Sequence, residues 1–106
     1  MSMYIVLAPI RLIEGVTEQA LLEASHAFQA DFVSKQPGIV KRLLLRSKDG
    51  AYADLVFFES KAAADRVVEA EASSPHCAKF FSIMQPPDEN LPDMGVLSFE
   101  QVTAYE

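Results

Sequence analysis

The stretch GIVKRLLLRSKDGAYADLVFFES, residues 38–60, decides the fold that this sequence predicts. Two runs rich in aliphatic and aromatic residues, 39–46 and 52–59, flank the turn signal Lys48-Asp49-Gly50. Such runs on either side of Asp-Gly are typical of a β-hairpin closed by a two-residue turn. We therefore expect Asp49 and Gly50 at the tip, with Lys48 opposite Ala51.

The side chains of this hairpin sort into two faces, because neighbours along a strand point to opposite sides of a sheet. With the two-residue turn, one face carries Lys41, Leu43, Leu45, Tyr52, Asp54, Val56 and Phe58, and the other carries Val40, Arg42, Leu44, Arg46, Ala53, Leu55, Phe57 and Glu59. Both faces are apolar at their centres, whereas a sheet with one solvated face alternates cleanly between apolar and polar residues. Something must therefore cover each side of the sheet.

The rest of the sequence predicts two further strands and three helices around the hairpin. Thr17, Ser60 and Ser74 are residues that cap helix N-termini, and Pro75 suits a first helical turn. The predicted strands are 4–10 and 96–103, and the predicted helices begin at Glu18, Lys61 and Pro75. This β-α-β-β-α-β order predicts one α+β domain over residues 1–106, a ferredoxin-like four-stranded antiparallel sheet with its helices on one face.

Composition narrows the class of protein. The net charge of −6 divides into +2 over residues 1–48 and −8 over residues 49–106, so the basic footprint of a nucleic-acid-binding protein is missing. One basic cluster remains open to two interpretations, a contact for an anion or a solvated, ion-paired strand: Lys35, Lys41, Arg42, Arg46 and Lys48. The single cysteine, the absence of a signal sequence and the absence of an apolar run of ~20 residues predict a cytoplasmic protein without a membrane span.

Two helices cover only one side of a four-stranded sheet. The second apolar face would then be a larger exposed patch than soluble monomers usually tolerate. We expect a homodimer in which the two sheets pack face to face through the same surface of each copy. A partner protein in that place is the alternative.

Three short segments resemble the dimeric α/β-barrel superfamily, in particular its antibiotic biosynthesis monooxygenase-like domains. They are Gln36-Pro37-Gly38-Ile39, Phe57-Phe58-Glu59-Ser60, and Ser74-Pro75-His76-Cys77 followed by Phe80-Phe81. The resemblance implies a dimer with a pocket between helices and sheet, in a family that includes cofactor-free quinone-forming monooxygenases and haem-degrading enzymes. Where the family often has tryptophan, this chain has Phe58, and Phe81 stands where the haem-degrading branch has its histidine. The resemblance therefore implies no haem, and we expect no cofactor.

Six residues are candidates for a site, each with a structural alternative. Asp54 and His76 are the expected catalytic residues, and Tyr52, Phe58, His26 and Cys77 are the expected ligand-binding residues. A carboxylate in an apolar cavity has a raised pKa, so Asp54 is a candidate base toward a phenol; otherwise it pairs with a neighbouring charge.

The two histidines and the cysteine are less specific signals. His76 lies near a helix N-terminus, which favours a neutral imidazole that donates or accepts a proton, and His26 is a candidate acid or base on the first helix. Either is alternatively a boundary residue. Cys77 is a reactive thiol or a small buried filler. No spacing of histidine, cysteine or carboxylate residues matches a metal site.

Two functions remain open. The first is a dimer that holds a small, flat, largely apolar molecule between helices and sheet and oxidises it with dioxygen and no cofactor, as a quinol-type monooxygenase. The second is a non-catalytic dimeric binding or regulatory module whose pocket is filled by its own side chains.

Overall fold

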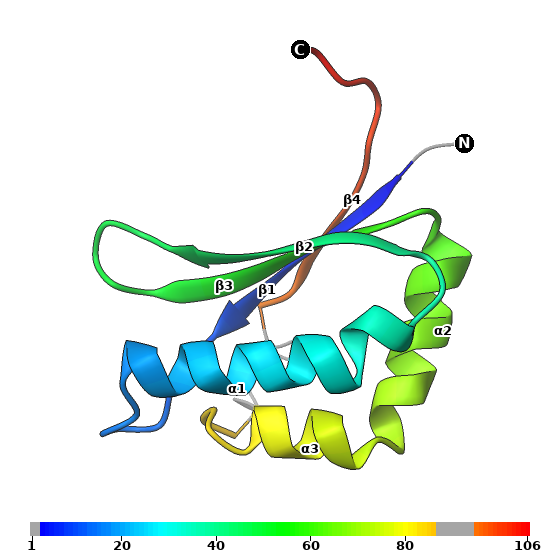
Figure 1. The fold of residues 1–106 in the computed structure, drawn as a ribbon. Helices are drawn as coiled ribbons and strands as arrows, with labels where there is room; N and C mark the ends of the chain where they lie inside the picture. Colours follow the sequence, from blue (N-terminus) through cyan, green and yellow to red (C-terminus); the bar gives the residue numbers. More distant parts are fainter. Residues whose placement is uncertain (1–2, 87–94) are drawn as a thin grey trace.

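Four strands form one antiparallel sheet in the order β2-β3-β1-β4. The computed structural model describes residues 3–86 and 95–106. Its elements are β1 (Tyr4–Ile10), α1 (Glu18–Asp31), the 3-10 turn η1 (Val33–Lys35), β2 (Ile39–Arg46), β3 (Tyr52–Phe58), α2 (Lys61–Ala72), α3 (Pro75–Phe81) and β4 (Leu97–Glu100). Figure 1 shows all three α-helices on the same side of the sheet. The predicted ferredoxin-like fold is confirmed, with a last strand shorter than the expected 96–103.

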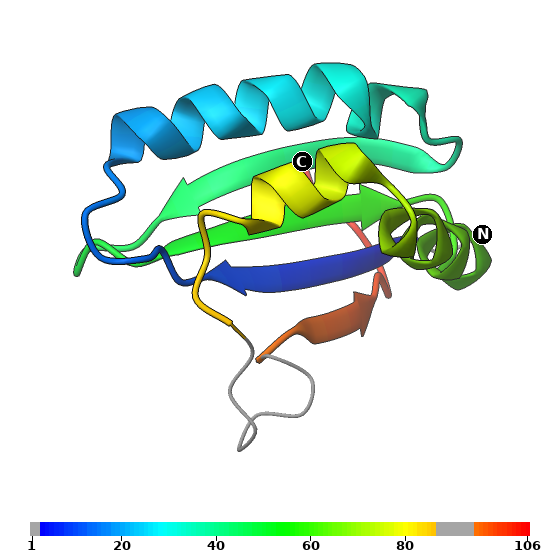
Figure 2. The ribbon, with the colours of Figure 1, turned by 90° about the horizontal axis from the view of Figure 1, so that it is seen from below.

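Each α-helix begins at the cap that the sequence predicts. The hydroxyls of Thr17, Ser60 and Ser74 accept hydrogen bonds from the backbone N–H groups three residues onward, at 3.1, 3.1 and 3.3 Å. Pro75 occupies the first turn of α3, where its missing N–H costs nothing. Seen from below the sheet, α1 and α3 lie side by side near β2 and β3, whereas α2 lies at one end (Figure 2).

The hairpin loop differs from the prediction. Arg46 pairs with Tyr52, and the Ser47 N–H donates to the Ala51 carbonyl at 2.8 Å, so the loop has three residues and the expected two-residue turn is wrong. The Asp49 carboxylate accepts from the Ser47 hydroxyl and from the Ala51 N–H within the loop. Gly50, at φ +85°, supplies the positive φ that a three-residue hairpin loop requires.

This one-residue difference moves the β2 side chains from Lys41 to Arg46 to the other face of the sheet relative to β3. A bulge between Ile39 and Lys41 leaves Ile39 paired with Phe58. Leu44 pairs with Asp54 and Arg42 pairs with Val56. The face toward the helices therefore carries Arg42, Leu44 and Arg46 beside Tyr52, Asp54 and Val56, and the opposite face carries Lys41, Leu43 and Leu45 beside Ala53, Leu55 and Phe57. The two faces predicted for residues 41–46 are therefore exchanged.

The core lies between the sheet and the helices. No described helix covers the other face of the sheet. Leu21 and Cys77 are fully buried, and Phe58 and Phe80 are buried beside them. On the uncovered face, which we call the back face, Leu45, Leu97 and Phe99 are exposed by 39%, 52% and 49%. Among the described residues, no helix has the length and apolar character needed to cross a membrane.

Candidate active site

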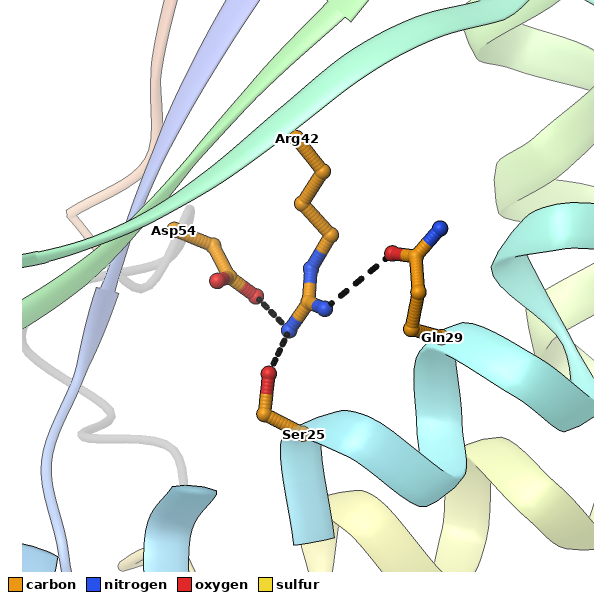
Figure 3. A network of polar contacts seen from close by, with 4 residues as sticks. All are labelled: Ser25, Gln29, Arg42 and Asp54. Carbon is orange, nitrogen blue, oxygen red and sulfur yellow. Dashed lines mark hydrogen bonds and ion pairs between the residues drawn. The ribbon is translucent and has the colours of Figure 1, made fainter. Parts of the chain in front are cut away.

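A buried ion pair stands at the centre of the helix-facing side of the sheet. The Arg42 Nη2 atom on β2 lies 3.1 Å from Oδ2 of Asp54 on β3, and the two side chains are only 6% and 10% exposed. Figure 3 shows both side chains reaching from the sheet toward α1. Moving each charge out of water costs about 10⁰ to 10¹ kcal/mol. The attraction between the two charges offsets this cost only when further hydrogen bonds satisfy their remaining polar atoms.

The helices supply that compensation for the guanidinium. Arg42 Nη2 also donates to the Ser25 hydroxyl at 3.0 Å, and Nη1 donates to Oε1 of Gln29 at 3.4 Å (Figure 3). The Arg42 Cζ atom lies 5.1 Å from the ring centroid of Phe28 and 5.4 Å from that of Phe80. These two rings stack at 4.3 Å with an interplanar angle of 7°. The guanidinium is thus fixed by polar contacts and by cation–π contacts.

Among residues 3–86 and 95–106, two buried polar atoms of this pair have no hydrogen-bond partner: Nε of Arg42 and Oδ1 of Asp54. Buried polar atoms are almost always hydrogen-bonded, because leaving one without a partner costs about 1–3 kcal/mol. One of these atoms is a donor and the other an acceptor. A ligand hydroxyl or a water molecule has the chemistry to satisfy the carboxylate oxygen.

Two carboxyl groups in this region hold protons more tightly than usual. Burial raises the pKa of Asp54, and the charge and hydrogen bond of Arg42 oppose that rise. Burial also raises the pKa of Glu71, near the end of α2, and the negative charge of Asp54 raises it further. A carboxylate with a raised pKa is a stronger base than an exposed one, which suits proton transfer near neutral pH.

The other predicted residues of the sheet and of α3 occupy structural positions. The Tyr52 hydroxyl donates to Oε1 of Glu18 at 2.9 Å, and this bond raises the pKa of Tyr52. Arg46 contacts the same oxygen at 2.6 Å and is the main cause of a lowered pKa for Glu18. Phe58 is a core side chain, and Cys77 is fully buried with a pKa raised by burial. Both surroundings suit packing residues.

His76 lies at a groove between α1 and α3. The groove has a volume of about 150 Å³, and its lining includes Phe28, Phe80, Asp31 and His76. His76 Nδ1 lies 3.8 Å from Oδ2 of Asp31, and both side chains are about half exposed. Phe28 and Phe80 line this groove and also contact Arg42, so they form a layer between His76 and the ion pair. The structure does not bring His76 and Asp54 into contact.

His26 lies on the exposed surface of α1, so the structure does not join it to the other candidates. Four residues of the site were not predicted: Ser25, Gln29, Arg42 as a partner of Asp54, and Glu71. Ser25 carried a signal, since a serine between Leu21 and Phe28 interrupts the apolar stripe of α1. Within residues 3–86 and 95–106, no group of three or more histidine, cysteine or acidic side chains has an arrangement suited to a metal ion.

These features define the class of structure: a ferredoxin-like sheet with a buried arginine–carboxylate pair beneath its helices. No family model matches the chain, and no curated protein matches it. Several solved structures match the chain in fold. SnoaB, a cofactor-independent oxygenase from Streptomyces nogalater, is 18% identical with a TM-score of 0.65, covering 100% of this chain and 97% of that one.

Two further structures show the same likeness. A provisionally assigned antibiotic biosynthesis monooxygenase from Chloroflexus aurantiacus is 15% identical with a TM-score of 0.65, covering 99% of this chain and 98% of that one. Rv0793 from Mycobacterium tuberculosis is 18% identical with a TM-score of 0.61, covering 99% and 98%. At these identities the likeness concerns the fold. The chain thus has the ferredoxin-like fold of the antibiotic biosynthesis monooxygenases, and the resemblance seen in the sequence is confirmed at that level.

Proposed function

We propose that this protein binds a small, flat aromatic molecule with an acidic hydroxyl between its helices and its sheet, and oxidises it with dioxygen and no cofactor. The observation that carries the proposal is the free acceptor Oδ1 of Asp54, buried beside a fixed positive charge. The fold shared with a cofactor-independent oxygenase supports the class of reaction, although function depends on the site rather than on the fold.

In the proposed reaction, Asp54 accepts the proton of the ring hydroxyl through Oδ1, and the Arg42 guanidinium offsets the negative charge of the resulting anion. Water is kept away by Phe28 and Phe80. The anion supplies the electrons: a ring C–H carbon becomes a carbonyl whose oxygen comes from dioxygen, and the carbon that bears the hydroxyl becomes a second carbonyl. The other oxygen atom leaves as water with the ring hydrogen and the hydroxyl proton. The substrate is oxidised by four electrons and dioxygen is reduced by four.

We propose further that two copies pair through their back faces and that the protein works in the cytoplasm. The exposed Leu45, Leu97 and Phe99 side chains support the pairing. They give a sheet face of the kind that a second copy covers through an isologous interface. The buried, unpaired Cys77 suits a reducing compartment.

A non-catalytic binding or regulatory module is the second candidate, and one observation favours it. Phe28, Phe80 and Arg42 occupy the space between helices and sheet, and the groove outside them is about 150 Å³. Pockets for drug-sized ligands usually measure about 300–1,000 Å³. In this case the ion pair is a structural element of a filled interior.

Oxygen uptake separates the two candidates. Purified protein is mixed with a panel of quinols, and the Asp54→Asn variant is compared with Asp65→Asn, the same change at an exposed position of α2. We expect uptake with at least one quinol, a fall in kcat of about 10²-fold or more in Asp54→Asn, and wild-type turnover in Asp65→Asn. No uptake with any quinol would favour the non-catalytic module, and unchanged turnover in Asp54→Asn would exclude Asp54 as the base.

A further inference from the structure

The groove between α1 and α3 has a feature that the proposed reaction does not use. Its floor is apolar and includes Ala24, Ala27, Phe28, Phe80 and Ile83. Ala24 and Ala27 lie three residues apart on α1, and their small side chains leave space beside the two aromatic rings. A floor of alanine and phenylalanine suits an aromatic ring, which stacks on or packs edge-to-face against phenylalanine.

The polar residues that line the groove are all exposed and so mark its rim: Asp31, His76, Lys79 and Ser82. Asp31 and His76 lie 3.8 Å apart there, which is longer than a hydrogen bond, and Lys79 also lines the groove. A ligand hydroxyl near Asp31 and His76 could donate to the carboxylate and accept from the imidazole. The positive charge of Lys79 favours an acidic hydroxyl, because it stabilises the anion that such a hydroxyl forms. The rim is therefore complementary to a polar ring substituent.

The volume of the groove matches that of a single ring. A cavity of about 150 Å³ lined by apolar side chains is large enough for benzene, and this groove measures about 150 Å³. Fused two-ring or three-ring molecules exceed that volume. The groove and the ion pair share two side chains, because Phe28 and Phe80 also contact Arg42.

We infer that this groove is an outer binding subsite for a single aromatic ring bearing a hydroxyl, with the ring against Phe28 and Phe80 and the hydroxyl at His76 and Asp31. The inference rests in part on the proposed function, since it restricts the substrate class to one-ring phenols and quinols. Phe28 and Phe80, which would contact such a ring, also contact Arg42.

Phenol, toluene and 1-naphthol test the inference without any oxidation. The chain has two histidines, and His26 is exposed on α1 outside the groove lining, so the ring signals of His76 in NMR spectra report binding and those of His26 serve as an internal control. The signals are assigned with His26→Gln. We expect phenol to move the His76 signals saturably at about millimolar concentration, with toluene and 1-naphthol each at least about tenfold weaker.

A matched pair of variants locates the ligand. Ala27→Leu fills the groove with a residue of good helix propensity, whereas Ala30→Leu makes the same change at an exposed position outside the lining. Ala27→Leu should weaken phenol binding at least about tenfold, and Ala30→Leu should change it less than about twofold. With an active quinol, Ala27→Leu should raise KM and leave kcat unchanged.

Several outcomes would overturn the inference whatever the oxygen electrode shows. They are a His76 signal that does not respond to phenol, a response that survives Ala27→Leu, and equal binding of phenol and toluene or of phenol and 1-naphthol. The converse separates the two proposals: phenol binding that Ala27→Leu removes, in a protein that consumes no oxygen with any quinol, upholds the subsite and contradicts the oxygenase.

Discussion

Arg42→Met should strongly destabilise the protein, because it leaves the Asp54 carboxylate buried without its counter-charge. The change removes an ion pair between side chains that are 6% and 10% exposed, together with the hydrogen bonds to Ser25 and Gln29. Breaking a buried pair by removing one partner costs about 3–5 kcal/mol. Against a total stability of about 5–15 kcal/mol for a domain of this size, Arg42→Met should remove a large fraction.

The double variant Arg42→Met/Asp54→Val tests the cause of this loss. Replacing both charges by apolar residues of similar volume is often neutral or stabilising, and valine suits the strand conformation of β3. The double variant should therefore recover most of the loss, with a coupling free energy of about 2 kcal/mol or more. It should also lack oxygenase activity, because the base is gone.

The pH dependence of Arg42→Met follows from the pKa of Asp54. Burial raises this pKa in the folded protein, so the folded state binds the proton more tightly than the unfolded state, and stability falls as pH rises from the unfolded pKa of about 3.9 through the folded one. Loss of Arg42 raises the folded pKa further. The destabilisation should therefore grow between pH 4 and pH 7, by at most about 1.4 kcal/mol per pH unit.

Urea unfolding at pH 4 and pH 7, at one protein concentration, measures all three effects. Fixed concentration matters because pairing of copies would make the apparent stability concentration-dependent. The reasoning is refuted if Arg42→Met costs less than about 1 kcal/mol at pH 7, or if the two single changes are additive within about 0.5 kcal/mol. It is equally refuted if the cost is larger at pH 4 than at pH 7.

Three further predictions concern the backbone, the back face and the thiol. Gly38→Ala should destabilise by about 1–3 kcal/mol more than Gly50→Ala in urea unfolding, because both residues have positive φ but only at Gly38 would a Cβ lie 2.6 Å from a side-chain atom of α2. Leu97→Glu should shift the protein to a monomer in analytical ultracentrifugation at micromolar concentration, whereas Val68→Glu, at an exposed position of α2, should not; a wild-type monomer contradicts the dimer. The buried Cys77, whose pKa is raised by burial, should react with a thiol reagent only after unfolding, and rapid reaction in the native protein would contradict its placement.

Local signals in the sequence predict most of the fold. The capping side chains of Thr17, Ser60 and Ser74 bond to the backbone within three residues, so the sequence alone contains both partners of each interaction. The turn was less determined, because Asp49-Gly50 suits both a two-residue and a three-residue hairpin loop. The choice depends on hydrogen bonds of Ser47 and Asp49 within the loop.

That choice decides the site. A two-residue turn places Arg42 on the face opposite Asp54, and the three-residue loop places both on the face toward the helices. The place of Asp54 on β3 makes it a candidate from the sequence alone. Its partner Arg42 depends on the register between β2 and β3, which the alternation of apolar and polar residues does not fix. Glu71 and Phe80 approach the site from α2 and α3, and only the packing of these helices on the sheet brings them there.

The most direct test of the account is a crystal structure of the protein with a one-ring quinol bound under anaerobic conditions, so that no oxidation occurs. The account predicts a ligand hydroxyl oxygen about 2.6–3.2 Å from Oδ1 of Asp54, the acceptor that has no partner in the part of the chain that the structure describes. A ligand confined to the outer groove, with Oδ1 bonded to water or to another side chain, would contradict the role of Asp54 as the base.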